Sequence, residues 1–133
     1  MAKIVKINNI SIKLPDKATI HRYINLDKLY QPSVQRSDIL LILLYKELKY
    51  VVIIEDTGRV KIKDFERLNK TLEDLKEKKY LPQEAVFIKI IHHKGIKSGR
   101  ALISRIKMRY RVELQECRYR FIDLEQIFKR YGW

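Results

Sequence analysis

Two apolar segments joined by a short polar turn constrain the fold of this chain more than any other feature. Residues 37–44 read Ser-Asp-Ile-Leu-Leu-Ile-Leu-Leu and residues 50–54 read Tyr-Val-Val-Ile-Ile, with a mostly polar turn over residues 45–49. Nearly continuous apolar runs of this length are typical of strands that are buried on both faces. Because a short connection favours an antiparallel hairpin, we expect a two-stranded hairpin in the middle of a covered sheet.

The hydrophobic period changes several times along the rest of the chain. Residues 3–14 alternate around Asn8-Asn9 and predict a bent strand or hairpin, whereas residues 18–30 are ambiguous and would give a short helix. After the central hairpin we expect, in chain order, a helix over 64–79 with Asp64 as its N-cap, a core strand over 85–91, a helix over 102–114, a short strand over 119–122 and a terminal helix over 127–133.

This order of elements predicts the fold class. Long helices between core strands imply crossover connections. We therefore expect an α/β fold with a mixed central β-sheet flanked by helices, formed by residues 1–133 as a single domain.

The charge balance narrows the class of partner. Among 133 residues, 29 are Lys or Arg and 16 are Asp or Glu, which gives a formal net charge of +13. Such an excess favours polyanionic partners, so nucleic acid is the first expectation and an anionic membrane surface the second. Hydrophobic residues make up 46% of the chain, which excludes a disordered basic tail.

Other features of the composition predict a soluble intracellular protein. No apolar run reaches the roughly 18 residues that a membrane span needs, and the first residues lack the apolar block of a signal peptide. Cys117 is the only cysteine, which excludes an internal disulfide. We therefore expect a cytoplasmic protein with no membrane partner. The low content of Gly and Pro, with many charged residues, hints at a heat-adapted source.

Two acidic residues flank the predicted hairpin. Asp38 opens the first strand, and Glu55 closes the second on the same face as Val51 and Ile53. Because the start of the first strand lies beside the end of the second, the two carboxylates should converge at one end of the sheet. Such a pair can bind a hard cation such as Mg²⁺, which could activate water for attack on a phosphodiester. The alternative is two ordinary strand-end acids that face solvent.

The arrangement resembles a known superfamily. A core strand opened by Asp38, a hairpin, a strand ending in Glu55-Asp56-Thr57, then helix, strand and helix is similar to the layout of the restriction-endonuclease-like PD-(D/E)XK nucleases. Small, basic, single-domain archaeal Holliday-junction resolvases are the most similar group within it. The resemblance implies a restriction-endonuclease-like core and a metal-dependent endonuclease that acts on DNA rather than RNA. It also implies that Asp38, Glu55 and the peptide carbonyl of Asp56 bind Mg²⁺ or Mn²⁺.

One position departs from the pattern of the superfamily. The motif lysine, which orients or deprotonates the attacking water, should stand where this chain has Thr57, and Ser37 stands where the pattern has proline. Lys61, Lys63 or Lys89 could supply the cation from a neighbouring position. The competing hypothesis is a catalytically inactive nucleic-acid-binding protein on a decayed nuclease scaffold, of an archaeal viral or plasmid type. A third is a structural protein whose charge is incidental.

A basic loop and a basic helix are the expected contacts with the DNA backbone. Lys94, Lys97 and Arg100 lie in a polar segment that leads into a helix N-terminus, where free N–H groups favour phosphate. Arg105 and Arg109 continue the positive charge along that helix.

Two further segments carry predictions of their own. His92-His93 is expected to belong to the solvated basic loop, because adjacent histidines on an extended chain point to opposite faces and seldom chelate one ion together. The aromatic residues near the C-terminus, which ends at Trp133, would close a homodimer if they are exposed.

Overall fold

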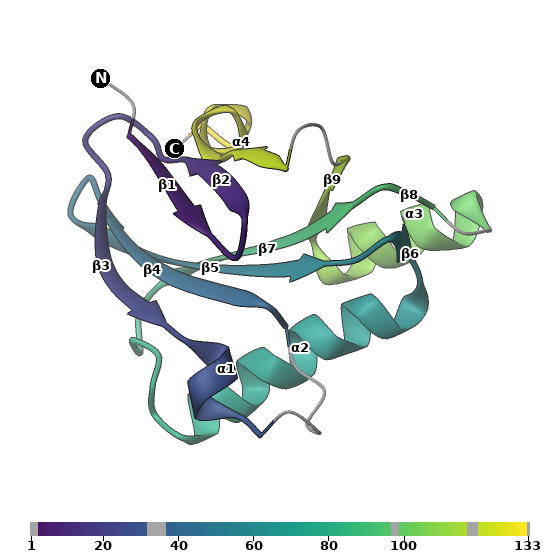
Figure 1. The fold of residues 1–133 in the computed structure, drawn as a ribbon, viewed down its shortest axis with the longest axis horizontal. Helices are drawn as coiled ribbons and strands as arrows, with labels where there is room; N and C mark the ends of the chain where they lie inside the picture. The colour runs from purple at the N-terminus through teal and green to yellow at the C-terminus, as the bar shows by residue number, and fades with distance from the viewer. Residues whose placement is uncertain (1–2, 32–36, 97–98, 117–119, 133) are drawn as a thin grey trace.

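A five-stranded mixed sheet runs through the middle of the molecule (Figure 1). The computed structural model describes residues 3–31, 37–96, 99–116 and 120–132. The strands of the sheet, in spatial order, are β3 (Thr19–Ile24), β4 (Ile39–Tyr45), β5 (Leu48–Asp56), β7 (Val86–His93) and β9 (Val112–Glu116). Strand β4 is antiparallel to both of its neighbours, β3 and β5, whereas β5, β7 and β9 are parallel. The predicted class, an α/β fold with a mixed central sheet, is confirmed.

The predicted central hairpin is formed by β4 and β5. Their register pairs Ile39 with Ile54 and Tyr45 with Leu48, and the turn between them consists of Lys46 and Glu47, both with positive φ. Successive residues pack into two different apolar clusters on opposite faces of the sheet. This double burial explains why neither strand shows an alternating polar pattern.

Three helices cover one face of the sheet (Figure 1). They are the short α1 (Leu26–Leu29), the long α2 (Ile62–Glu77) and α3 (Arg100–Tyr110). Helices α2 and α3 are the crossovers that join β5 to β7 and β7 to β9. The apolar residues of α2 pack against the sheet, including Phe65, Leu68, Leu72 and Leu75.

The start of α2 differs from the prediction. The N-cap is Lys61, not Asp64, and Asp64 is the third residue of the helix. Its carboxylate accepts a hydrogen bond from the backbone N–H of Lys61 over 2.9 Å. An acidic side chain at this third position satisfies a free donor of the first turn, which is why it marks a helix start without being the cap.

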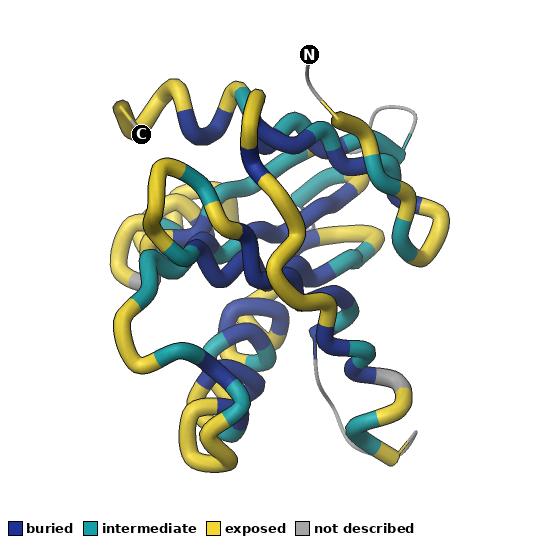
Figure 2. Tube along the Cα trace, turned by 90° about the vertical axis from the view of Figure 1, so that its left-hand side faces the viewer, coloured by how far each residue is buried: buried dark blue, intermediate teal, exposed yellow. Residues whose placement is uncertain are grey.

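The other face of the sheet is covered by a small sheet and a short helix (Figure 1). This layer contains β1 (Ile4–Ile7), β2 (Ile10–Lys13), β10 (Phe121–Asp123) and α4 (Leu124–Arg130). The predicted N-terminal hairpin is confirmed, with Asn8 and Asn9 in its turn at positive φ. Figure 2 shows burial concentrated along the central strands between the two covering layers.

Four short or marginal strands were missed or misread from the sequence. Residues 19–24, expected to start a helix, form the edge strand β3, whose first five residues are exposed. Strand β9 lies where a helix was expected to continue to Leu114. Strands β6 (Arg59–Val60) and β8 (Gly95–Ile96) form a two-residue parallel pair. Because edge strands are held by backbone pairing, their side chains carry little hydrophobic signal.

Candidate functional site

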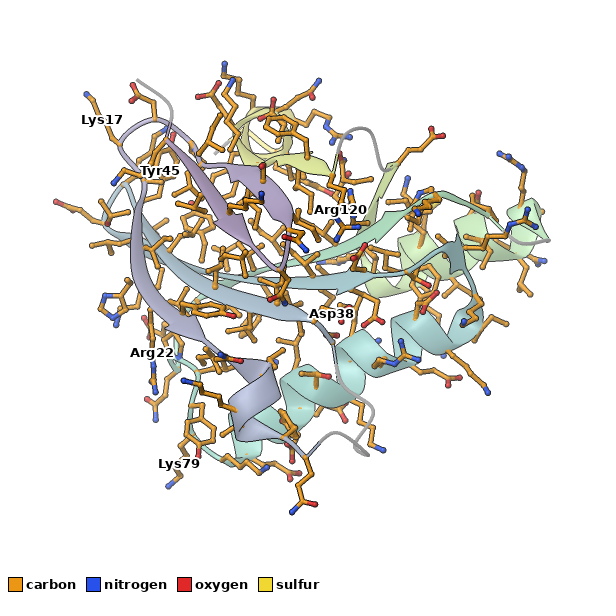
Figure 3. All side chains as sticks on the ribbon, in the orientation of Figure 1. Lys17, Arg22, Asp38, Tyr45, Lys79 and Arg120 are labelled. Carbon is orange, nitrogen blue, oxygen red and sulfur yellow. The ribbon has the colours of Figure 1, made fainter. Side chains whose placement is uncertain are left out.

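Asp38 and Glu55 lie side by side at one end of the central hairpin. The backbone N–H of Asp38 donates to the carbonyl of Ile54 over 3.1 Å, which places Asp38 opposite Glu55 in the β4–β5 register. The Asp38 carboxylate also accepts a hydrogen bond from the backbone N–H of Asp56 over 2.7 Å. Figure 3 shows Asp38 where β4 begins, beside the end of β5. The predicted convergence of the two acids is therefore present.

Glu55 is almost completely buried against α2. Its side chain is 2% exposed and shares the α2 face of β5 with Val51 and Ile53. Burial and the nearby Asp38 carboxylate raise the pKa of Glu55 to about 8, although Arg67 opposes the change. The alternative of a solvated strand-end acid is wrong for Glu55.

Arg67 of α2 is the cation that meets this carboxylate. Its guanidinium donates to Oε1 of Glu55 and lies 3.6 Å from Oδ1 of Asp64, which is fully buried. The other oxygen of Glu55, Oε2, and Oδ1 of Asp64 are buried without a hydrogen-bond partner among the described residues. Glu55 and Asp64 thus pair with one arginine, and the Asp38 carboxylate also contributes to raising the pKa of Arg67.

Sequence reasoning missed both α2 residues as members of the site. Asp64 was assigned a capping role, and Arg67 was not considered. A signal was present, because Asp64 falls on the same helical stripe as Leu68, Leu72 and Leu75. A charged residue on an otherwise apolar stripe is seldom buried without a partner.

The lysines expected to replace the motif lysine lie elsewhere. Lys61 and Lys63 are exposed at the start of α2, where Lys63 and Arg67 line a cavity of about 170 Å³. Lys89 pairs with Ile53 in the sheet register, and its amine donates to Asn69 over 2.9 Å. The cation that contacts Glu55 is Arg67, which the sequence-based prediction did not include.

The side chain of Asp56 points to the opposite face of the sheet. Its carboxylate lies 3.0 Å from Nδ1 of His92 and 3.0 Å from the guanidinium of Arg120. Arg120 also donates to the carbonyls of Asn8 and Asn9, which ties the N-terminal hairpin to the end of β5. The predicted role of Asp56 concerned its peptide carbonyl, so this side-chain network is separate from it.

The prediction that His92 and His93 belong to a solvated loop is wrong. Both are the last residues of β7, with exposed fractions of 0% and 7%. Burial lowers the pKa of His93. The parallel strands on either side extend β7 further than its apolar residues alone indicated.

Asp38 and Glu55, at the end of the central hairpin, are the candidate ligands for a divalent cation. Among the described residues, no three His, Cys, Asp or Glu side chains are grouped so that they could hold a metal ion. Mg²⁺ is commonly bound by one or two carboxylates and several waters. The buried Oε2 of Glu55, which has no hydrogen-bond partner among the described residues, and the adjacent Asp38 carboxylate fit that pattern. Without a ligand, burial of such an oxygen costs free energy of folding.

Of the predicted DNA contacts, Lys94 lies between β7 and β8, whereas Arg100, Arg105 and Arg109 belong to α3. Lys94, Arg100, Arg105 and Arg109 are exposed, and Gly99 precedes the helix in the left-handed conformation. Lys97 lies outside the described residues.

In the described part of the chain, no helix is both long and apolar enough to cross a bilayer. Comparisons with protein-family models, with curated proteins and with solved structures found no match.

Proposed function

We propose that this chain is a DNA-binding protein with a PD-(D/E)XK-type core and that it is a metal-dependent endonuclease. The order of elements supports this: a strand opened by Asp38, a hairpin, a strand containing Glu55, the helix α2, the strand β7 and the helix α3. This is the layout on which the resemblance to that superfamily rests.

One observation carries the proposal. Glu55 is buried beside Asp38 with an oxygen that has no partner among the described residues, and its pKa is raised to about 8. A carboxyl held in such an environment weakens the fold, and strongly perturbed carboxyls of this kind are typical of functional sites. A divalent cation between Asp38 and Glu55 would offset this loss of folding stability.

Asp38 and Glu55 would hold Mg²⁺ or Mn²⁺, with the peptide carbonyl of Asp56 as a further ligand. When bound, the ion supplies Lewis acidity and an activated water for phosphodiester hydrolysis. Arg67 would then provide the positive charge that the superfamily's motif lysine supplies and that Thr57 lacks. It would do so from α2 instead of from the end of β5. Lys61 and Lys63, exposed on the same first turns of α2, add positive charge near the site.

The net charge of +13 supports a nucleic-acid partner, with Lys94, Lys97, Arg100, Arg105 and Arg109 as the phosphate contacts. DNA is proposed over RNA on the basis of the superfamily resemblance. A cytoplasmic location and a homodimer through the C-terminal aromatic residues stay predictions.

A second function is favoured by the ion pair of Arg67 with Glu55. If Arg67 is a permanent counter-ion, no metal is needed to balance Glu55. The protein would then bind DNA without cutting it, on the scaffold of a nuclease that has lost its motif lysine at Thr57.

Cleavage assays separate the two functions. Labelled duplex, single-stranded and four-way-junction DNA are incubated with the protein and Mg²⁺ or Mn²⁺, beside the variants Asp38→Asn and Glu55→Gln. The matched control is Glu66→Gln, which removes an exposed acid from the same helix region. The endonuclease is supported if cutting is lost in the first two variants, retained in the control, and DNA binding persists in all three.

Binding without metal-dependent cutting of any of these substrates would contradict the endonuclease and support the inactive scaffold. DNA affinity that does not fall with rising salt would contradict both, because each neutralised phosphate steepens that dependence. Arg67→Gln adds a further distinction. It lowers cutting if Arg67 assists hydrolysis, and only destabilises the fold if Arg67 is a counter-ion.

A further inference from the structure

A cavity lies at the edge of the sheet, at the end away from Asp38 and Glu55. The pairing of β7 with β9 begins at Lys89, so the segment Val86–Ile88 pairs with β5 on one side and has no β9 residue on the other. A cavity of about 530 Å³ occupies this place. The end of α3 lines it from one layer and Tyr131, which follows α4, from the other. Its volume falls in the range of small-molecule sites.

The lining of this cavity is positively charged. Lys89, Arg109 and Arg111 contribute three cations, and Glu113 contributes one carboxylate. That carboxylate lies 3.2 Å from the guanidinium of Arg130 and accepts a hydrogen bond from the hydroxyl of Tyr131 over 2.7 Å. Three cations against one carboxylate give the lining of the cavity an excess of positive charge.

The pKa of Lys89 supports this account. Burial is the largest cause that lowers the pKa of Lys89. Repulsion from Lys76 and Arg111 lowers it further, whereas Glu73 raises it. Neighbouring cations such as Lys89 and Arg111 repel one another, and an anion bound between them would relieve that repulsion.

Arg111 is held in a conformation that favours glycine. It ends α3 in the left-handed region, with φ of 54° and ψ of 52°. Non-glycine residues rarely occupy this region, because the side chain clashes with the backbone. Helices often have glycine in this position, so a single substitution of Arg111 by glycine removes a lining cation and relieves the backbone together.

We propose that this cavity binds a small phosphate monoester of about the size of a mononucleotide. Two arginines and a lysine match the several oxygens of a terminal phosphate, and arginine forms paired hydrogen bonds to it. Phe87 and the ring of Tyr131 offer an apolar wall to the remainder of the ligand. The volume suits a small free ligand, and the exposed lining residues Arg109, Arg111 and Tyr131 leave the cavity open to solvent. This inference does not depend on the endonuclease.

The test measures ligand binding by the full chain. Isothermal titration calorimetry is performed with adenosine 5′-monophosphate, inorganic phosphate and adenosine. The informative variant is Arg111→Gly, which removes a cation from the cavity and relieves the backbone at the same time. We expect it to weaken nucleotide binding by about tenfold or more and to raise Tm by a few degrees.

Lys79→Gly is the matched control. Lys79 follows α2 at φ of 60° and is not among the residues that line the cavity. This variant should gain stability in the same way and keep the affinity of the parent. Arg105→Gln, on the exposed face of α3, controls for the loss of one positive charge.

Three results would overturn the proposal. The first is equal affinity of the parent and Arg111→Gly for the nucleotide, and the second is equal affinity of the parent for adenosine and its monophosphate. The third is absence of nucleotide binding; if Arg111→Gly then also binds duplex DNA more weakly, the cavity edge is part of the DNA-binding surface.

Discussion

Glu55 makes the stability of this protein depend on pH in a direction opposite to that of an ordinary paired carboxylate. Its pKa is about 8 in the folded chain, against an ordinary value of 4.5. Between these values the folded chain carries a proton that the unfolded chain lacks. The free energy of unfolding therefore falls as the pH rises through this window. Replacement of Glu55 by Gln removes the titrating group while retaining a carbonyl oxygen that can accept from Arg67.

The size of the effect follows from the interval between the two pKa values. At about 1.4 kcal/mol for each pH unit, it reaches at most about 5 kcal/mol at pH 9. Below pH 4.5 the carboxyl is protonated in both states and contributes no difference. We therefore expect Glu55→Gln and the parent to be about equally stable near pH 4.5 and the variant to be more stable by several kcal/mol at pH 9.

Urea unfolding followed by circular dichroism between pH 4.5 and 9, with chelator present to remove divalent metals, measures this difference. Glu66→Gln is the control, since Glu66 is exposed and its removal should leave the slope with pH unchanged. A constant difference between Glu55→Gln and the parent across the whole range would refute the reasoning, because it would mean that Glu55 titrates alike in both states. If Glu55→Gln were less stable at pH 9, the ion pair with Arg67 would outweigh the cost of burial.

Three other predictions test the fold around the site. Exchange of Lys46 and Glu47 for Asn and Gly should raise the free energy of unfolding by about 1 kcal/mol in urea titrations, because both residues have positive φ in a two-residue hairpin turn. Arg120→Met should lower it by about 1–3 kcal/mol and speed amide exchange in the N-terminal hairpin, because it removes the tie to Asp56. His93 has a pKa below 6.5, so stability should fall as the pH drops below that value; His93→Gln in the Glu55→Gln background should flatten this slope.

The central hairpin and the meeting of Asp38 with Glu55 could be predicted because they follow from local rules. Two apolar runs joined by a short turn leave one reasonable pairing, and the two-residue period of a strand decides that Glu55 faces the same way as Val51 and Ile53. The crossover helix α2 was predictable for the same reason, since the spacing of its apolar residues is an intrinsic property of the segment.

The environment of the acids could not be obtained in this way. The contact of Arg67 with Glu55 depends on how α2 lies across β5, which no spacing within either segment encodes. The burial of His92 depends on strands that pair with β7 on both sides, and one of these, β9, carries no clear strand pattern of its own.

The amino-acid sequence by itself thus determined the class of the fold, the positive charge and the two acids at one sheet end, because these depend on composition and on periodicity within short segments. Tertiary structure decided which cation meets Glu55, that the carboxyl is dry enough to hold a proton near neutral pH, and that Lys89, Arg109 and Arg111 share one cavity. Those properties depend on packing between segments far apart in the chain, where burial and neighbouring charges set the energy of each group.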